Sequence, residues 1–272
     1  MSKPLTLGAV LYDPKVSIIW EIICGFFEQN GIPMDPVFFT NYEKQVDALA
    51  GGLLDIAWNS PLAWLDTVRR GGGRFSAVAM RDTDCDRRTH FVAKRGHGLE
   101  KLDQLRGKTL GVGAQDSPQA TLIPIEVLHR AGLEAGRDYE VTRFDVLVGK
   151  HGDHIGGELD AFRALERGQV AVSTMLDLNW KTWTGDGTIN AAEYETVATT
   201  GTFDHCVFAV KTELPEKVRQ RWIEVLFSMS YDNPKHREMM DMEGLKAWVP
   251  GRTTGFELLT SAIEHQRFWA GA

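Results

Sequence analysis

The chain has 272 residues, of which 43 % are hydrophobic and 25 % are charged, a composition typical of a globular protein. Thirty Lys and Arg residues stand against thirty-seven Asp and Glu residues, a formal net charge of −7 that argues against a nucleic-acid partner. Three widely spaced cysteines, Cys24, Cys85 and Cys206, form no disulfide framework and indicate reduced thiols.

The N-terminal residues as given do not show the pattern expected of an export signal or a membrane anchor. Its apolar run, Leu5–Leu11, is shorter than the core of a signal peptide and is followed by no small-residue cleavage site. No apolar stretch of the chain approaches the roughly 20 residues of a membrane span. We therefore expect no membrane insertion, and a cytoplasmic protein if Met1 is the native start. If a signal peptide has been removed, the expected location is the periplasm.

Short β-rich runs alternate with amphipathic helices, which is typical of an α/β fold. In the first part, strands are expected over 5–11, 37–39, 55–58 and 75–80, with helices over 16–30, 42–50 and from Pro61. In the second part, strands are expected over 89–94, 109–113, 139–144 and 170–173, with a short helix over 102–105 and longer helices ending near Arg130 and Arg167. A strand near 203–210 and helices over 215–230, 234–243 and 256–269 complete the chain. Periodicity alone fits two lobes or a single doubly wound sheet.

A polar segment at residues 116–121, DSPQAT, leads from an expected strand into an expected helix. Free backbone N–H groups and the positive end of the helix dipole meet at such a point. The hydroxyls of Ser117 and Thr121 and the amide of Gln119 add donors on either side of Ala120. The segment is therefore a candidate anion site. An ordinary helix N-cap is the alternative, because Ser and Asp are favoured there.

Aromatic and polar residues follow three expected strands of the first part. They are Tyr12, Tyr42, Trp58, Asn59 and Ser60. Open α/β sheets bind ligands beyond the carboxyl ends of their strands, so these residues are candidates to contact a ligand. Aromatic rings would supply apolar walls, and Asn59 and Ser60 oriented hydrogen bonds. A place for Trp58 in the core is the alternative.

Four stretches together resemble the phosphonate/phosphite-binding proteins of ABC importers. They are YEKQVDALAGGLLDIAW at 42–58, LDQLRGKTLGVG at 102–113, DSPQAT at 116–121 and DAFRALERGQV at 160–170. The resemblance implies a type 2 periplasmic-binding-protein fold, with two lobes, a mainly parallel central sheet in each and a ligand cleft between them. One lobe would comprise 1–88 plus 205–272 and the other 89–204, with hinge strands near 82–91 and 201–207. Whether Cys85 and Cys206 meet near these crossings stays open.

The sequence departs from this family at its binding histidine. The resemblance places that histidine where this chain has Glu158, and a nearby loop carries His151-Gly152-Asp153-His154 instead. A carboxylate would repel a phosphonate, so Glu158 could instead hold an amine or hydroxyl, or take a proton. Rearrangement of the loop would let His154 replace the missing histidine. The glycine-rich loop does not preorganise its histidines, so we expect no metal. The sequence has no P-loop or G-x-G-x-x-G signature, so we expect no cofactor.

These observations support two functions. The first is binding of a small anionic molecule, bearing a phosphonate, phosphate or carboxylate group, by closure of the two lobes. If the protein is exported, an ABC importer permease is its expected partner. The second is a cytosolic enzyme on the same fold, of the dehydratase, decarboxylase or lyase type, with Glu158 or His154 as the acid/base group. A cytosolic ligand sensor is a less defined third possibility.

Overall fold

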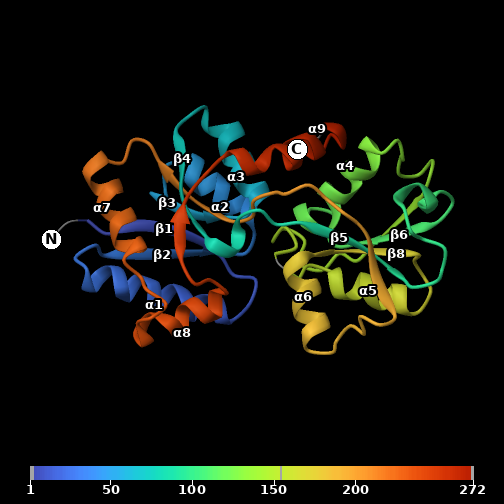
Figure 1. Ribbon diagram of the computed structural model, residues 1–272. Helices are drawn as coiled ribbons and strands as arrows, with labels where there is room; N and C mark the ends of the chain where they lie inside the picture. The colour runs from blue at the N-terminus through green and yellow to red at the C-terminus, as the bar shows by residue number, and fades with distance from the viewer. Residues whose placement is uncertain (1–2, 154, 271–272) are drawn as a thin grey trace. The chain divides into compact units, whose positions relative to one another are not determined.

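A computed structural model describes residues 3–153 and 155–270, which form two compact units (Figure 1). Unit 1 comprises the chain up to Cys85 together with Asp204–Gly255, and unit 2 comprises Asp86–Phe203 together with the chain from Phe256 onward. The chain therefore passes from one unit to the other three times. Each unit has its own sheet and its own core, in agreement with the predicted α/β fold.

Unit 1 is built on a six-stranded mixed sheet in the order β11-β4-β10-β3-β1-β2. Its elements are β1 (Leu5–Val10), α1 (Lys15–Gln29), β2 (Met34–Phe39), α2 (Tyr42–Ala50), β3 (Ile56–Asn59), α3 (Pro61–Gly71), β4 (Phe75–Arg81), β10 (Val207–Lys211), α7 (Glu216–Phe227), α8 (Pro234–Glu243) and β11 (Trp248–Pro250). Strand β1 pairs in parallel with β2 and β3, whereas β10 runs antiparallel to β3 and β4. The loops that follow β1, β2 and β3 therefore all leave the sheet on the side of the strands' carboxyl ends.

Apolar residues on both faces of this sheet are covered by helices. Helices α1 and α8 lie on one face, and α2 and α3 lie on the other (Figure 1). The α1 side holds the larger core, in which Phe27 stacks on Trp222 of α7 with ring centroids 5.2 Å apart. A smaller cluster on the α2 side includes Val10, Tyr42 and Ala63.

Unit 2 is built on a five-stranded mixed sheet in the order β7-β6-β8-β5-β9. Its elements are β5 (Thr89–Lys94), η2 (Leu102–Leu105), β6 (Thr109–Val112), η3 (Pro118–Leu122), α4 (Ile123–Arg130), β7 (Glu140–Arg143), α5 (Glu158–Glu166), β8 (Val172–Leu176), α6 (Asp177–Gly185), β9 (Tyr194–Thr199) and α9 (Glu257–His265). Strand β6 is parallel to β7 and β8, and β5 is antiparallel to β8 and β9.

Alternation along the strands of unit 2 divides its core between the two faces of the sheet. Phe91 and Ala93 belong to the cluster that α4 covers, whereas Val92 belongs to the cluster with α5 and α6. Gly111 of β6 packs against α5 and the residues after it, because a Cβ there would lie 3.5 Å from the Ala161 Cβ of α5 and 3.0 Å from the Val170 side chain. This packing holds the N-terminus of α5 near the end of β6.

The C-terminal helix α9 belongs to unit 2, although the sequence analysis assigned residues 205–272 to the first lobe. Helix α9 packs on α4, and the Gln266 side chain donates a hydrogen bond to the Leu122 carbonyl at 2.8 Å. The difference has a simple cause. Helical periodicity shows which face of α9 is apolar, but it does not show which neighbour covers that face.

A buried ion cluster stands near the end of unit 1's first segment. The Arg81 guanidinium pairs with Asp84 and with Glu243, in each case at 2.6 Å. Burial alone would raise the pKa of Asp84, but the charge of Arg81 more than offsets it and holds this pKa well below its usual range. Cys85, Cys206 and Cys24 are free thiols. Among the described residues, no helix has the length and apolar character needed to cross a bilayer.

Candidate functional site

The segment predicted to bind an anion forms the first turn between β6 and α4. The Ser117 hydroxyl accepts a hydrogen bond from the Ala120 N–H at 3.2 Å, and the Ser117 carbonyl accepts one from the Thr121 N–H at 3.1 Å. Pro118 occupies the following position, where its missing N–H costs no hydrogen bond. Ser117 is therefore an N-cap. Because its oxygen acts as the acceptor, the hydroxyl proton can serve a second bond.

A second loop, of which residues 145–153 and 155–157 are described, packs against this segment. The Asp116 carboxylate accepts a hydrogen bond from the Gly149 N–H at 2.6 Å. In the same way, the Gly156 carbonyl accepts a hydrogen bond from the Ala114 N–H at 3.0 Å. The two loops thus form one packed body at the carboxyl end of β6.

Glycines make this close packing possible. A Cβ on Gly113 would overlap the Gly156 carbonyl, and a Cβ on Gly156 would overlap the backbone of Gly152. Gly157 has φ +84° and lies against the Phe144 carbonyl, so its backbone conformation also favours glycine. The described glycines of this stretch therefore allow the second loop to contact the segment backbone to backbone.

Gln119 and Glu158 meet beneath the two loops, and both side chains are fully buried. The Gln119 amide nitrogen donates to the Gly152 carbonyl at 2.8 Å and lies 3.4 Å from Glu158 Oε1. Glu158 Oε2 accepts hydrogen bonds from the Leu176 N–H and from the Asn179 side chain, both at 2.8 Å. The Glu158 carboxyl therefore ties the start of α5 to the junction of β8 and α6.

The environment of Glu158 changes its acidity. Burial raises its pKa from 4.5 to about 7, even though the bonds from Leu176, Asn179 and Gln119 favour the ionised form. The nearby charge of Asp177 acts in the same direction as burial. Both protonation states of this carboxyl are therefore populated at neutral pH, and the protonated form carries no charge that would repel an anion.

Two buried polar atoms of the segment make no hydrogen bond to any residue that the structure describes. They are the hydroxyl oxygen of Thr121 and the Oε1 atom of Gln119. Thr121 is 1 % exposed and Gln119 is 0 % exposed. A buried polar atom without a hydrogen-bond partner destabilises the fold, so each of these two atoms could form a favourable hydrogen bond with an additional group.

The remaining predicted residues of unit 2 have varied positions. Ala120 lies inside the first turn, where its carbonyl accepts a hydrogen bond from the Thr174 hydroxyl at 2.6 Å. His151 is buried and has φ +54°. His154 lies outside the described residues, so its predicted role as a binding or acid/base residue stays a prediction.

In unit 1, the predicted residues lie at or just beyond the carboxyl ends of β1, β2 and β3, and the two that belong to β3 have clear structural roles. Trp58 is 5 % exposed and packs in the core, with its ring 4.6 Å from Phe208 and the Arg81 guanidinium 5.2 Å from its centroid. The Asn59 side chain accepts from Gln45 at 2.8 Å and donates to the Thr67 hydroxyl at 3.1 Å.

The other three predicted residues of unit 1 lie at the starts of loops or helices. Ser60 caps α3 by accepting a hydrogen bond from the Ala63 N–H at 3.1 Å. Tyr42 is the buried first residue of α2, and Tyr12 is half-buried in the loop after β1. Contact of any of these residues with a ligand stays a prediction.

Two residues that the sequence analysis did not single out help to build the site. Thr174 of β8 fixes the Ala120 carbonyl, and Asn179 of α6 holds Glu158. Thr174 and Asn179 are 54 and 21 residues away from these partners in the chain. No spacing rule connects positions so far apart, and α6 has no strong amphipathic pattern that would have revealed it.

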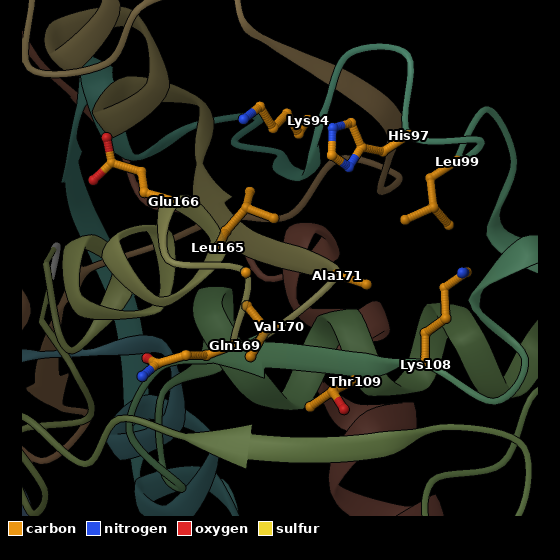
Figure 2. A pocket seen from close by; sticks show the side chains of 11 residues that line it. Lys94, His97, Leu99, Lys108, Thr109, Leu165, Glu166, Gln169, Val170 and Ala171 are labelled. Atoms are coloured by element: carbon orange, nitrogen blue, oxygen red, sulfur yellow. The ribbon is translucent and has the colours of Figure 1, made fainter.

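A separate cavity of about 390 Å³ lies in unit 2 at the opposite end of β6 (Figure 2). Lys94, His97 and Lys108 line it together with apolar residues such as Leu99 and Ala171. Lys108 immediately precedes β6, whereas the Ser117 segment follows it. The cavity is therefore distinct from the segment predicted to bind an anion.

Comparison with known proteins gives a family match. The sequence profile of a family described as "ABC transporter, phosphonate, periplasmic substrate-binding protein" matches residues 26–254. A Haemophilus influenzae protein, described as an uncharacterized protein, is 62 % identical over 29 residues. That stretch spans 11 % of this chain and 41 % of the relative.

Solved structures share the fold. PhnD1 from Prochlorococcus marinus, in complex with methylphosphonate, is 15 % identical with a TM-score of 0.74, over 97 % of this chain and 98 % of that one. XAC2383 from Xanthomonas citri bound to ATP is 19 % identical with a TM-score of 0.73, over 98 % of each chain. The periplasmic aliphatic sulphonate binding protein SsuA from Escherichia coli is 14 % identical with a TM-score of 0.58, over 97 % of this chain and 84 % of that one. These likenesses confirm the predicted two-lobed binding-protein fold.

Proposed function

This chain belongs to the phosphonate-type periplasmic substrate-binding proteins of ABC transporters, and on that premise we propose that it binds a small anion through the Ser117–Thr121 segment. The anion would bear a phosphonate, phosphate or carboxylate group. Membership in this family implies a small-molecule ligand and an ABC-transporter permease as partner. The solved relatives include proteins bound to methylphosphonate and to ATP, both of which carry phosphorus oxyanions.

The observation that carries this proposal is the buried Thr121 hydroxyl. It has no hydrogen-bond partner within the described ranges, yet it lies on the first turn between a strand and a helix. A ligand oxygen there would accept its proton and would also gain from the positive end of the helix dipole. The second proton available on this turn belongs to the Ser117 hydroxyl. Two hydroxyl donors on one turn suit an acceptor with several oxygens.

Glu158 fits this proposal as a neutral neighbour of the anion. Its oxygens already accept hydrogen bonds from the Leu176 N–H and from the side chains of Asn179 and Gln119, so Glu158 mainly holds these groups in position. A raised pKa lets it carry a proton when an anion approaches. The alternative of an enzyme, with Glu158 as the acid/base group, draws no support from the relatives reported above.

The cell compartment follows from the partner. The family is normally periplasmic. An importer permease collects its ligand outside the cytoplasmic membrane, so we propose the periplasm as the place where this protein works. Fractionation of native cells checks this: recovery with cytoplasmic marker enzymes would favour the sensor hypothesis instead.

Binding is tested by isothermal titration of the full chain with methylphosphonate, inorganic phosphate, methanesulfonate and acetate. The proposal expects saturable one-to-one binding of at least one of these anions, together with thermal stabilisation that grows with its concentration. Methylammonium chloride serves as a control for ionic strength and for the hypothesis that Glu158 holds an amine. Binding of the amine alone, or of no probe at all at millimolar concentration, would contradict the proposal.

A further inference from the structure

Unit 1 holds a cavity of about 350 Å³ that the proposed function does not use. It lies between the start of β1, the turn of residues 31–33 that joins α1 to β2, and α7 with the residues just before it. The start of β1 and helix α7 lie beside each other in unit 1 (Figure 1). The cavity is therefore at the amino ends of β1 and β2, whereas the residues predicted to contact a ligand lie at the carboxyl ends of these strands.

Apolar side chains form much of the cavity wall. Leu5 and Leu214 are 9 % and 8 % exposed and belong to the large core of unit 1. Ile32 packs against the same core, and Val218 of α7 is 37 % exposed. An apolar chain placed here would extend the core outward and would remove accessible apolar surface from water, which is favourable.

Three cations complete the lining. They are Lys3, Lys217 and Arg221, and no Asp or Glu lines the cavity among the described residues. Lys217 and Arg221 are four positions apart on α7, so they lie on the same face of that helix. The chain as a whole has the opposite bias, with 37 acidic residues against 30 Lys and Arg residues. The cavity is therefore a positive site on an acidic protein.

The charges of these side chains can be offered to a ligand. Lys3 and Lys217 form no ion pair with any residue that the structure describes. Arg221 lies 3.9 Å from Glu224, and the two side chains are 56 % and 55 % exposed. An exposed pair of this kind contributes little to stability, so Arg221 can exchange Glu224 for another anion at small cost.

We propose that this cavity binds an amphipathic anion with a single alkyl chain, of which a medium-chain alkanoate is the simplest example. The chain would lie against Leu5, Leu214 and Val218, and the carboxylate would contact Lys217 and Arg221. A neutral apolar molecule would leave the cations unused, and an inorganic anion would leave the apolar wall in contact with water. The volume is near the lower end of the roughly 300–1,000 Å³ typical of small-molecule pockets, which suits one short chain.

The test is isothermal titration of the full chain with hexanoate, octanoate and octylammonium, each below the concentration at which it forms micelles. Octylammonium has a chain of similar length to octanoate and the opposite charge. The double variant Lys217→Gln/Arg221→Gln removes two charges of the lining, and Val218→Glu places a carboxylate in the apolar wall. The matched control is Lys44→Gln/Lys181→Gln, which removes the same charge at exposed positions outside the cavity. Circular dichroism verifies that each variant is folded.

The proposal expects saturable binding of octanoate, roughly tenfold tighter than that of hexanoate, because each buried methylene raises affinity about threefold to fourfold. The double variant should lose about fivefold in octanoate affinity, while the control keeps the affinity of the parent. Val218→Glu should lose at least about tenfold, because its carboxylate would repel that of the ligand. Hydrogen exchange of peptides covering α7 should slow when octanoate is bound.

One further variant separates this cavity from the Ser117–Thr121 segment, for which a carboxylate is also a candidate ligand. Thr121→Val should bind octanoate as tightly as the parent does, whatever its effect on small anions. A loss of octanoate affinity in Thr121→Val would assign the binding to that segment and overturn the proposal. Absence of saturable octanoate binding, equal affinity for octylammonium, or unchanged octanoate affinity in Lys217→Gln/Arg221→Gln would also overturn it.

Discussion

The buried carboxyl of Glu158 should make the stability of unit 2 depend on pH in a direction opposite to that of most carboxylates. In the folded protein its pKa is raised to about 7, whereas in the unfolded chain it returns to about 4.5. The folded state therefore binds more protons than the unfolded state between these two values. The contribution of Glu158 to stability is therefore fully present below the pKa of this group in the unfolded chain, and it is lost as pH rises through the pKa of this group in the folded protein.

The size of the effect follows from the gap between the two pKa values. At ~1.36 kcal/mol per pKa unit, the gap corresponds to about 3 kcal/mol of stability lost by neutral pH. Glu158→Gln removes this titration and keeps the shape of the side chain. Its amide cannot accept all three hydrogen bonds, so the variant should lose about 1–3 kcal/mol at acid pH. The penalty should shrink or reverse in neutral solution.

The assay is urea unfolding of parent and variant from about pH 4.5 to about pH 7.5, the window in which Glu158 titrates. Circular dichroism follows the transition, and hydrogen exchange of peptides covering β8 assigns it to unit 2. The quantity of interest is the difference between the two unfolding free energies, because titration of other groups cancels in it. That difference should change by about 3 kcal/mol across the range. A flat difference would refute the reasoning.

Three further predictions concern the loops, the ion cluster and the ligand. Gly156→Ala should destabilise unit 2 by about 1–3 kcal/mol, because its Cβ would overlap the Gly152 backbone. Gly25→Ala should instead stabilise unit 1 by about 0.5–1 kcal/mol, because Gly25 lies in α1 with open space around it. Equal melting temperatures of the two variants would contradict this prediction. Arg81→Met should destabilise unit 1 by about 3–5 kcal/mol in neutral solution, because Asp84 and Glu243 would stay buried without the Arg81 cation. The loss should be smaller in acid, where the two carboxyls can protonate. A loss of stability in urea unfolding that does not depend on pH would contradict this prediction. The affinity for methanesulfonate, which keeps one negative charge, should rise several-fold as pH falls through about 7, because Glu158 gains its proton there. Calorimetry that shows the same affinity on both sides of this pH would contradict the placement of the anion near that carboxyl.

Local signals in the sequence predicted many elements well. The helix Tyr42–Ala50 has the predicted bounds, because Asn41 caps its start and Gly51 and Gly52 follow its end. The strand Thr89–Lys94 and the helix Pro234–Glu243 also agree with the prediction. In each case residues within a few positions of the element determine where it begins and ends, so one sequence contains the needed information.

Some elements carry no such local signal. Helix α6 has little amphipathic character, and β11 has only three residues at the edge of its sheet. The same limit applies to the site. The composition of the Ser117–Thr121 segment indicates a candidate anion site, but the hydrogen bonding of the buried Glu158 depends on Asn179 of α6, a helix that the sequence does not predict. The core position of Trp58 likewise depends on partners that are distant in the chain, such as Phe208.

The central claim, that an anion binds at the Ser117–Thr121 turn, is tested most directly by titrating Thr121→Val. This variant keeps the volume of the side chain and removes a hydroxyl that has no protein partner in the described part of the chain. Thr184→Val is the matched control, because its hydroxyl donates to carbonyls of its own helix, those of Trp180 and Lys181. The account predicts that Thr121→Val loses about tenfold in affinity for the anion that binds the parent, with unchanged or higher stability, while Thr184→Val binds normally. Equal affinity in Thr121→Val and the parent would contradict it.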